Sequence, residues 1–117
     1  MVQMIHTASY FNMVDHVGKV YGISSSMPKG FVPDGRLLSF IPDYKLVRDY
    51  KDSVITWQEY EKIYISTMDS VDHEDDFGVM RGSEPCTLLC WERTVGRCHR
   101  RLLGEWLGKL GWEVDIK

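Results

Sequence analysis

Two thiols, an imidazole, two carboxylates and four arginines lie within one stretch near the carboxyl end of the chain, residues 87–110 (TLLCWERTVGRCHRRLLGEWLGKL). The pattern predicts a buried strand over residues 87–91, then a loop, then a helix that begins at Cys98. In α/β proteins the ligand binds outside the carboxyl ends of the strands, next to helix N-termini. This strand-to-helix segment is therefore the first candidate for a functional site.

The first turn of that helix has the features of an anion site. The residues predicted there are Cys98, His99 and Arg100. Backbone amides are unpaired at a helix N-terminus and the helix dipole is positive, so a phosphate or carboxylate binds well there. Arg100 would add a bidentate partner. The alternative is that the other arginines solvate a surface loop and pair with acids. These arginines are Arg93, Arg97 and Arg101, with Glu105 as an acidic neighbour.

The same residues could perform thiol chemistry. A cysteine at a helix N-terminus beside arginines is expected to ionise more readily. Cys98 and its neighbour Cys90 are thus candidate nucleophiles, with His99 as the general base. Against this, cysteine is often simply buried. Cys86 and Cys90 are four residues apart on one strand and face the same side, which suits a packing role for at least one of them.

Cys90, Cys98 and His99 also supply three soft metal ligands. Their spacing is not one of the paired C-x2-C forms of zinc sites, and a fourth ligand would have to come from elsewhere. From the sequence we therefore expect no metal and no cofactor.

Glu92 follows the predicted strand directly. Its carboxylate could accept a hydrogen bond from a sugar hydroxyl or act at an anomeric carbon. It could equally form an internal ion pair with Arg100 that holds the loop in place. All these roles stay open at this point.

Polar and aromatic residues at the ends of two other predicted strands complete the candidate site. They are Ser9, Tyr10, Phe11, Ser24 and Ser25. The two aromatic residues could stack on a base, or they could belong to the core. The two later serines could donate hydroxyls or amides to the same anion, or simply form a turn.

Four short strands are predicted, over residues 3–8, 19–24, 87–91 and 112–116, with helical segments between them. This alternation predicts an α/β fold, a small three-layer sandwich with a mainly parallel, Rossmann-like sheet of about four strands. If residues 4–8 and 87–91 lie at its centre, a crevice outside their carboxyl ends would gather the candidate residues.

Three helices are predicted from their start signals and apolar faces. One begins at Asp43. The next begins at Thr56, where Thr56 and Glu59 form a capping box before one apolar face. That face contains Trp57, Tyr60, Tyr64 and Met68, with Ile63 beside them. The helix after Cys98 buries Leu102, Leu103, Trp106, Leu107 and Leu110 and ends before Gly111, a residue typical of a left-handed cap. Residues 69–80 fit either a solvated helix or a loop.

Length and charge limit the function classes. A chain of 117 residues forms one domain, spanning residues 1–117. Its net charge of −3 argues against a protein that wraps nucleic-acid polymers, which require a basic face. Residues 69–76 hold five acids, whereas residues 93–101 hold four arginines and no acid. This local positive field suits a small anion.

No apolar run reaches the length of a membrane span, and the first residues do not resemble a secretory signal. The three cysteines are an odd number, which favours reduced thiols over a disulfide framework. We therefore expect a cytoplasmic protein with no membrane partner.

The chain resembles the domain-of-unknown-function family 488, in particular the short members found in bacteria and phages. The resemblance rests on residues 88–107 (LLCWERTVGRCHRRLLGEWL), similar to that family's LLC-x-E segment followed by a CHR helix start. It extends over residues 6–11, 23–28, 38–51 and 55–64. It implies a Rossmann-like α/β sandwich with a pocket built around Cys90, Glu92, Cys98, His99 and Arg100, and it implies no reaction. The chain departs from the commoner ISR form of the family because serines follow the second strand.

From these observations we expect a small protein that senses or sequesters a phosphorylated or nucleotide-derived molecule, of phage or bacterial origin. The alternatives are an enzyme that acts on a nucleoside or nucleotide, with Cys90, Cys98 or Glu92 in the catalytic role, and a pure interaction module. A homo-oligomer is also open, since the chain is small and rich in Trp and Tyr.

Overall fold

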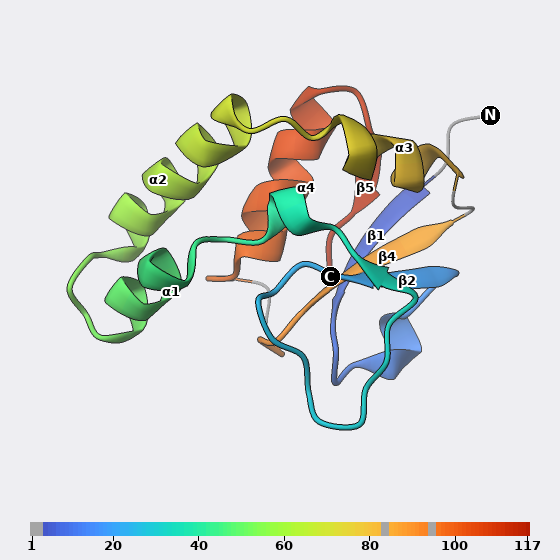
Figure 1. Ribbon diagram of the computed structural model, residues 1–117, viewed down its shortest axis with the longest axis horizontal. Coiled ribbons are helices and arrows are strands. Elements are labelled where there is room, and N and C mark those ends of the chain that lie inside the picture. The colour runs from blue at the N-terminus through green and yellow to red at the C-terminus, as the bar shows by residue number, and fades with distance from the viewer. Residues whose placement is uncertain (1–3, 83–84, 94–95) are drawn as a thin grey trace.

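Parallel strands form the centre of the molecule (Figure 1). The computed structural model describes residues 4–82, 85–93 and 96–117, and within them five strands lie in the order β3-β2-β4-β1-β5, each parallel to its neighbours. The strands are β1 (Met4–Ser9), β2 (Lys19–Gly22), β3 (Gly35–Arg36), β4 (Cys86–Cys90) and β5 (Glu113–Asp115). The predicted α/β class and parallel sheet are confirmed.

The strand count differs from the expected four because β3 was not predicted. β3 has only two residues and follows a segment rich in proline and glycine, which is typical of a loop. It pairs with the outer edge of β2, where Tyr21 lies opposite Gly35. Gln3, expected in the first strand, lies outside the described residues.

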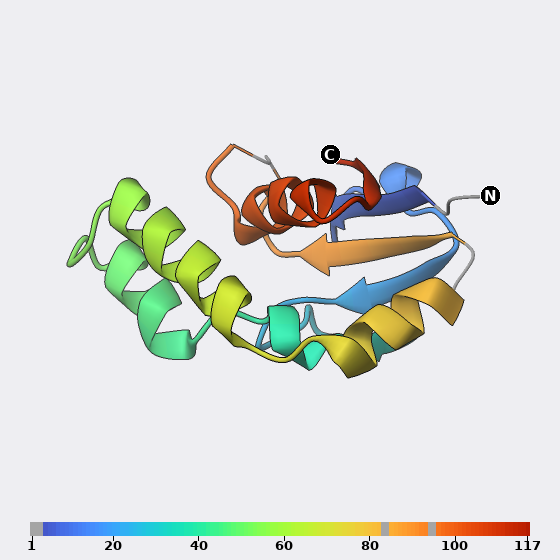
Figure 2. The same cartoon turned by 90° about the horizontal axis from the view of Figure 1, so that it is seen from above.

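The helices are distributed unequally around the sheet. Among the described residues they are α1 (Tyr44–Lys51), α2 (Trp57–Ser70), α3 (Glu74–Gly82) and α4 (His99–Lys109). Figure 2 shows α3 and α4 over one face, while α1 and α2 extend past the carboxyl ends of the strands. The other face is covered by a 3-10 helix, η1 (Met13–Asp15), and by the loop of residues 23–34. The third layer of the sandwich is thus mainly a loop. A second 3-10 helix, η2 (Leu38–Phe40), precedes α1.

The predicted start of α2 is confirmed. The backbone amide of Glu59 donates to Thr56 Oγ1 at 3.1 Å, and the amide of Thr56 donates to Glu59 Oε1 at 3.0 Å. The predicted apolar face is buried: Trp57, Tyr60, Tyr64 and Met68. Ile63, expected beside them, is 45% exposed, so that assignment was wrong. Only one face of α2 packs against the protein.

Helix α4 also follows the prediction, apart from its last turn. Cys98 is its N-cap, and Gly111 after its end has a φ of +101°, as a left-handed cap residue should. Leu110, expected in the core, lies past the helix and is 54% exposed. The buried leucines are Leu102, Leu103 and Leu107.

The acidic stretch is divided between two helices, which answers the question left open by the sequence. Its first residues end α2, and its last residues form the first turn of α3. Acids in a first turn complement the helix dipole. Asp76 also accepts a hydrogen bond of 2.9 Å from the amide of Ser39, which ties α3 to η2. In the described part of the chain no helix is both long and apolar enough to cross a membrane.

The register of the sheet brings three strand ends to one edge. Ser9 at the end of β1 lies opposite Cys90 at the end of β4, and Gly22 at the end of β2 lies opposite Leu89. Helix α4 begins close to this edge, because only a short loop separates it from β4. The carboxyl edge of the sheet is therefore where residues distant in sequence meet.

Candidate functional site

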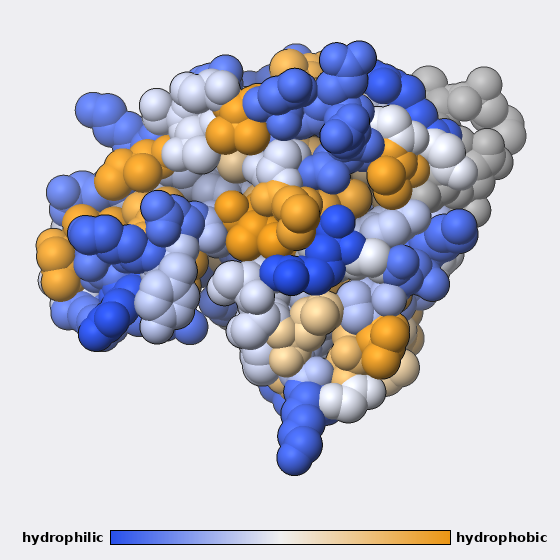
Figure 3. Space-filling model, in the orientation of Figure 1, coloured by the Kyte–Doolittle hydropathy of each residue, from blue (hydrophilic) through white to orange (hydrophobic). Residues whose placement is uncertain are grey.

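A cavity of about 380 Å³ lies at the carboxyl ends of β2 and β4. Its walls come from the loop after β2, from α1, from the first turns of α2 and from the start of α4. In Figure 3 the outline of the molecule is indented between α1 and the loop after β2, the two segments that face each other across this cavity. Six predicted site residues line it: Ser24, Ser25, Cys90, Glu92, Cys98 and His99.

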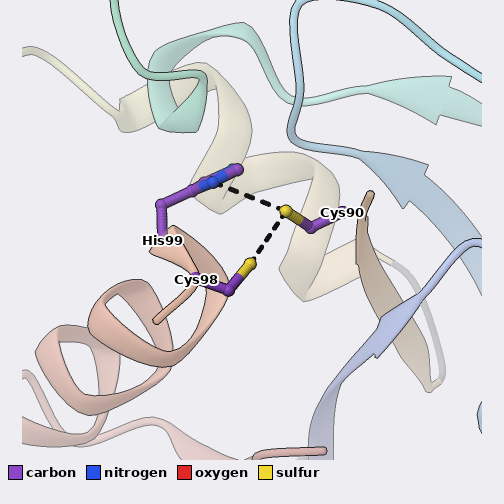
Figure 4. A group of neighbouring side chains, drawn as sticks. All are labelled: Cys90, Cys98 and His99. Carbon is purple, nitrogen blue, oxygen red and sulfur yellow. Dashed lines mark hydrogen bonds between the residues drawn. The ribbon is translucent and has the colours of Figure 1, made fainter. Parts of the chain in front are cut away.

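Four of these side chains form a cluster on one wall of the cavity. Cys90 Sγ lies 2.9 Å from Cys98 Sγ and 3.4 Å from His99 Nδ1. Glu92 Oε2 lies 3.0 Å from the sulfur of Cys90 and 3.3 Å from that of Cys98. Figure 4 shows Cys90, at the end of β4, directed toward Cys98 and His99 at the start of α4. A strand end and a helix start thus place two thiols, a carboxylate and an imidazole in mutual contact.

The backbone carbonyl of Ile23 determines the orientation of the His99 ring. His99 Nε2 lies 2.6 Å from that oxygen, which can only accept a hydrogen bond. Nε2 therefore carries the proton of the neutral ring, and Nδ1 presents a lone pair to the sulfur of Cys90. The edge of the imidazole also packs on Tyr64, with ring centroids 5.7 Å apart. The sequence alone did not predict the orientation of the His99 ring.

Burial and hydrogen bonds shift the pKa values of Glu92 and Cys98 in opposite directions. Burial alone would raise the pKa of the Glu92 carboxyl, but hydrogen bonds from the Cys90 thiol, the Glu92 amide and the Cys98 thiol lower it below its ordinary value. Glu92 is therefore a carboxylate at neutral pH. Burial, together with the hydrogen bond to Cys90, raises the pKa of the Cys98 thiol well above its ordinary value. The expectation that Cys98 ionises readily was wrong, because burial and the contact with Cys90 raise the pKa of the Cys98 thiol more than His99 lowers it.

Arg100 does not line the cavity. Its side chain is 1% exposed and donates to the backbone oxygens of Glu92 at 2.6 Å and Lys117 at 2.8 Å. Its Nη1 also donates to the sulfur of Cys98 at 3.3 Å. The ion pair considered between Glu92 and Arg100 is absent from the described residues, since Arg100 contacts the carbonyl of Glu92 and the Glu92 carboxylate contacts the thiols. Arg100 is therefore buried outside the cavity, where it holds the backbone of Glu92 and contacts the sulfur of Cys98.

The other arginines of the stretch differ from one another. Arg101 pairs with Glu105 at 3.0 Å, as the solvation alternative expected. The Arg93 guanidinium lies 4.7 Å from the centroid of the Phe11 ring, outside the cavity. Arg97 does line the cavity.

Ser9, Tyr10 and Phe11 also lie away from the cavity lining. The Tyr10 ring is buried on the opposite face of the sheet, where its hydroxyl bonds to Ser24 Oγ at 2.8 Å. Ser9 Oγ accepts from the amide of Phe11 at 3.2 Å, and Phe11 is 41% exposed. These three residues organise the end of β1 and the loop after β2.

The aromatic wall of the cavity was not predicted from the sequence. Tyr50 of α1 and Trp57 and Tyr60 of α2 line it, with ring centroids between 5.1 and 5.5 Å apart. Lys51 at the end of α1 lies beside them. Their helical spacing indicated a core face, and only the position of α1 and α2 past the sheet edge turns part of that face toward a cavity.

An arginine is present near the loop after β2, although it comes from elsewhere in the sequence. Arg36 of β3 donates through Nη2 to the carbonyls of Ser24 at 2.9 Å and Ser25 at 3.0 Å. It thereby holds the serine segment that departs from the ISR form. No pattern in the sequence linked this residue to the site.

Residues 16–111 match the family model DUF488-N3a, described as the active DUF488-N3 subclade. This range contains the whole cavity lining. The search of curated proteins and the search of solved structures found no significant match.

Proposed function

The chain belongs to the domain-of-unknown-function family 488, and we propose that it binds a phosphorylated or nucleotide-derived small molecule in the cavity at the carboxyl ends of β2 and β4. Membership of the family assigns no ligand, so the proposal rests on the cavity itself. Its volume of about 380 Å³ is within the range typical of small-molecule sites.

Two unpaired cations carry this proposal. Lys51 and Arg97 line the cavity, and neither has an ion-pair partner within the described part of the chain. Both also line an adjoining, more open hollow of about 520 Å³, so they lie at the rim that the two spaces share. The chain as a whole is acidic. A phosphate at this rim would be attracted by both side chains and by the positive end of α4.

The aromatic wall favours a ligand with a planar ring. Trp57 and Tyr60 are stacked, with their ring planes 14° apart, and Tyr50 packs against both. Aromatic faces bind bases by stacking, with little regard to the identity of the base. A nucleotide would thus place its ring against α1 and α2 and its phosphate at the rim. Glu92 would accept from a sugar hydroxyl.

Calorimetry with a panel of mononucleotides, dinucleotides and ADP-ribose-like compounds at low salt tests the proposal. We expect binding that weakens at high salt, and a loss of roughly tenfold or more when Lys51→Ala and Arg97→Ala are combined. Arg48→Ala is the matched control, because Arg48 is exposed on α1 and pairs with Asp52 outside the cavity. If no phosphate-bearing compound binds, the proposal is wrong.

An enzyme acting on a nucleoside or nucleotide is the second candidate. It is supported by the contact between Cys90 Sγ and the lone pair of His99 Nδ1 at 3.4 Å, and by the description of the matching subclade as active. Cys90 is the candidate nucleophile, because its sulfur contacts Nδ1 of His99. We expect iodoacetamide to label Cys90 faster than Cys86 at neutral pH, and His99→Gln to remove the difference. Equal, slow labelling of all the thiols would exclude the thiol mechanism.

We also propose that the protein is cytosolic, because all three cysteines are free thiols, the state expected in a reducing compartment. On the side of the molecule seen in Figure 3 the hydrophobic patches are separated by hydrophilic residues. Light scattering measures the molar mass in solution and so tests whether the chain forms a homo-oligomer.

A further inference from the structure

We propose that Cys90, Cys98 and His99 bind a zinc ion, with the carboxylate of Glu92 next to the fourth coordination position. This inference goes beyond the binding of an organic ligand and does not rest on it. It also reverses the expectation from the sequence, which found no fourth ligand and no paired cysteine motif.

The ligand atoms are already gathered. The sulfurs of Cys90 and Cys98 and Nδ1 of His99 all lie within 4.8 Å of one another. In tetrahedral zinc sites Zn–S distances of about 2.3 Å place two sulfurs roughly 3.7 Å apart. The sulfurs here are 2.9 Å apart, so they would separate by less than about 1 Å to admit the ion. Both thiols border a cavity, which leaves room for that movement.

The imidazole of His99 is oriented as a metal ligand requires. A metal-bound histidine usually donates its second ring N–H to a carbonyl or carboxylate, which fixes the tautomer and the ring direction. His99 does this with the carbonyl of Ile23 at 2.6 Å, leaving the lone pair of Nδ1 directed at the cluster. A histidine that served only as a packing residue would not need its free nitrogen to face two sulfurs.

The surrounding charges suit a bound cation and its thiolates. Zinc binds the thiolate form of cysteine, so each of the two thiols gives up its proton when the ion binds. Arg100 donates to the sulfur of Cys98 at 3.3 Å, which favours its negative form. Glu92 Oε2 contacts both sulfurs, so a carboxylate lies beside the position of the ion. Two thiolates, one carboxylate and Zn²⁺ sum to −1, which the buried guanidinium offsets.

The position of the cluster indicates the type of zinc site. Structural zinc sites have four protein ligands and are closed, whereas catalytic sites have three and an open position. Cys90, Cys98, His99 and Glu92 all line the cavity, so the fourth position of the ion would face a bound molecule or water. Thiolate and imidazole ligands favour zinc over magnesium or calcium.

Metal analysis and cobalt spectroscopy of the reduced, full-length protein test this inference. Reduction is needed because a disulfide between Cys90 and Cys98 would remove two ligands. We expect a single equivalent of zinc in protein produced in zinc-supplemented medium. After zinc removal, Co²⁺ should produce sulfur-to-cobalt charge-transfer bands and the intense visible bands of tetrahedral cobalt, and added zinc should abolish them. Zinc should also protect two of the three thiols from a thiol reagent.

Single variants assign the ligands. Cys90→Ala, Cys98→Ala and His99→Ala should each lose stoichiometric zinc, and Glu92→Gln should weaken binding by about 10-fold to 100-fold. Cys86→Ala is the matched control, because Cys86 is buried on the same face of β4 and takes no part in the cluster. Folding of every variant is checked by circular dichroism.

Protein without zinc and without cobalt charge-transfer bands would overturn the inference, as would bands that persist in both Cys90→Ala and Cys98→Ala. Both measurements use the metal alone. Their outcome is therefore independent of the nucleotide titrations, and either proposal can fail while the other stands.

Discussion

Cys86 and Cys90 occupy the two ends of the same strand, β4, and differ in almost everything except burial. Both are at most 1% exposed and both face α3 and α4. Cys86 has no hydrogen-bond partner in the described residues, and burial alone raises its pKa to about 11. Cys90 contacts a carboxylate, a second thiol and an imidazole. The same side chain is a packing residue at the amino end of the strand and part of a cluster of polar side chains at its carboxyl end.

The difference comes from what the chain places beyond each end. At the carboxyl end, a loop returns Glu92 and the start of α4 to the strand, while the carbonyl of Ile23 orients His99. At the amino end, apolar residues surround the sulfur. This arrangement follows the general rule that parallel sheets bind ligands at their carboxyl edge.

Arg100→Met should produce the largest change at the carboxyl end. It keeps most of the volume but removes the side-chain donor from the backbone oxygen of Glu92, and it leaves that of Lys117 with only the longer bond of 3.4 Å from Thr7 Oγ1. We expect the free energy of unfolding to fall by about 3 kcal/mol. Urea denaturation measures this loss, with exposed Arg48→Met as the control, expected to change stability by less than about 0.5 kcal/mol. Equal losses in both variants would contradict the supporting role of Arg100.

The free energy of unfolding at alkaline pH should report on Cys86, at the amino end of β4. The folded-state pKa of Cys86 is raised from 9.0 to about 11, so its thiolate forms more readily in the unfolded chain. The stabilising contribution of the neutral thiol is present below pH 9.0 and is lost as the pH rises to about 11. Relative to Cys86→Val, the natural protein should lose roughly 2 to 3 kcal/mol over this window. Parallel curves for the two proteins in urea would contradict this assignment.

Serine substitutions of Cys86 and Cys90 should give the smallest difference in stability, but they compare the two ends of β4 most directly. The hydroxyl in Cys86→Ser would be buried without a partner, which costs about 1 to 3 kcal/mol. The hydroxyl in Cys90→Ser can donate to Glu92 or His99, so we expect a loss below about 1 kcal/mol. Thermal unfolding of both variants in metal-free buffer measures the difference. A larger loss for Cys90→Ser would show that the cluster is primarily structural.

Local patterns predicted the strand-loop-helix segment well. The buried strand, the helix start at Cys98 and the capping box at Thr56 all depend on neighbours in sequence, and the structure confirms them. The strand covers Cys86–Cys90 and not residues 87–91 as predicted, and Trp91 is exposed. The gathering of Ser24, Cys90 and His99 at one edge also followed from the parallel sheet.

What the sequence could not predict depends on strand register and on helix placement. Tyr10 lies past the end of β1, whose last residue, Ser9, pairs with Cys90, so alternation directs its side chain to the opposite face. That conclusion requires the pairing of β1 with β4, which the sequence does not contain. The aromatic wall depends likewise on how α1 and α2 pack, since an apolar helical face looks the same whether it meets a core or a cavity.

The position of α1 and α2 past the end of the sheet has a consequence for folding and dynamics. These helices pack on each other and, through α2, on α4, so their docking closes the cavity from segments some forty residues apart in sequence. We expect these contacts to open more readily than the sheet, because α1 and α2 lie past its end and α2 buries only one face. A molecule or ion bound in the cavity would contact both the α1–α2 pair and the sheet with α4, and would therefore stabilise the docked position of the two helices. Hydrogen exchange in α1 and α2 should slow when the cavity is filled.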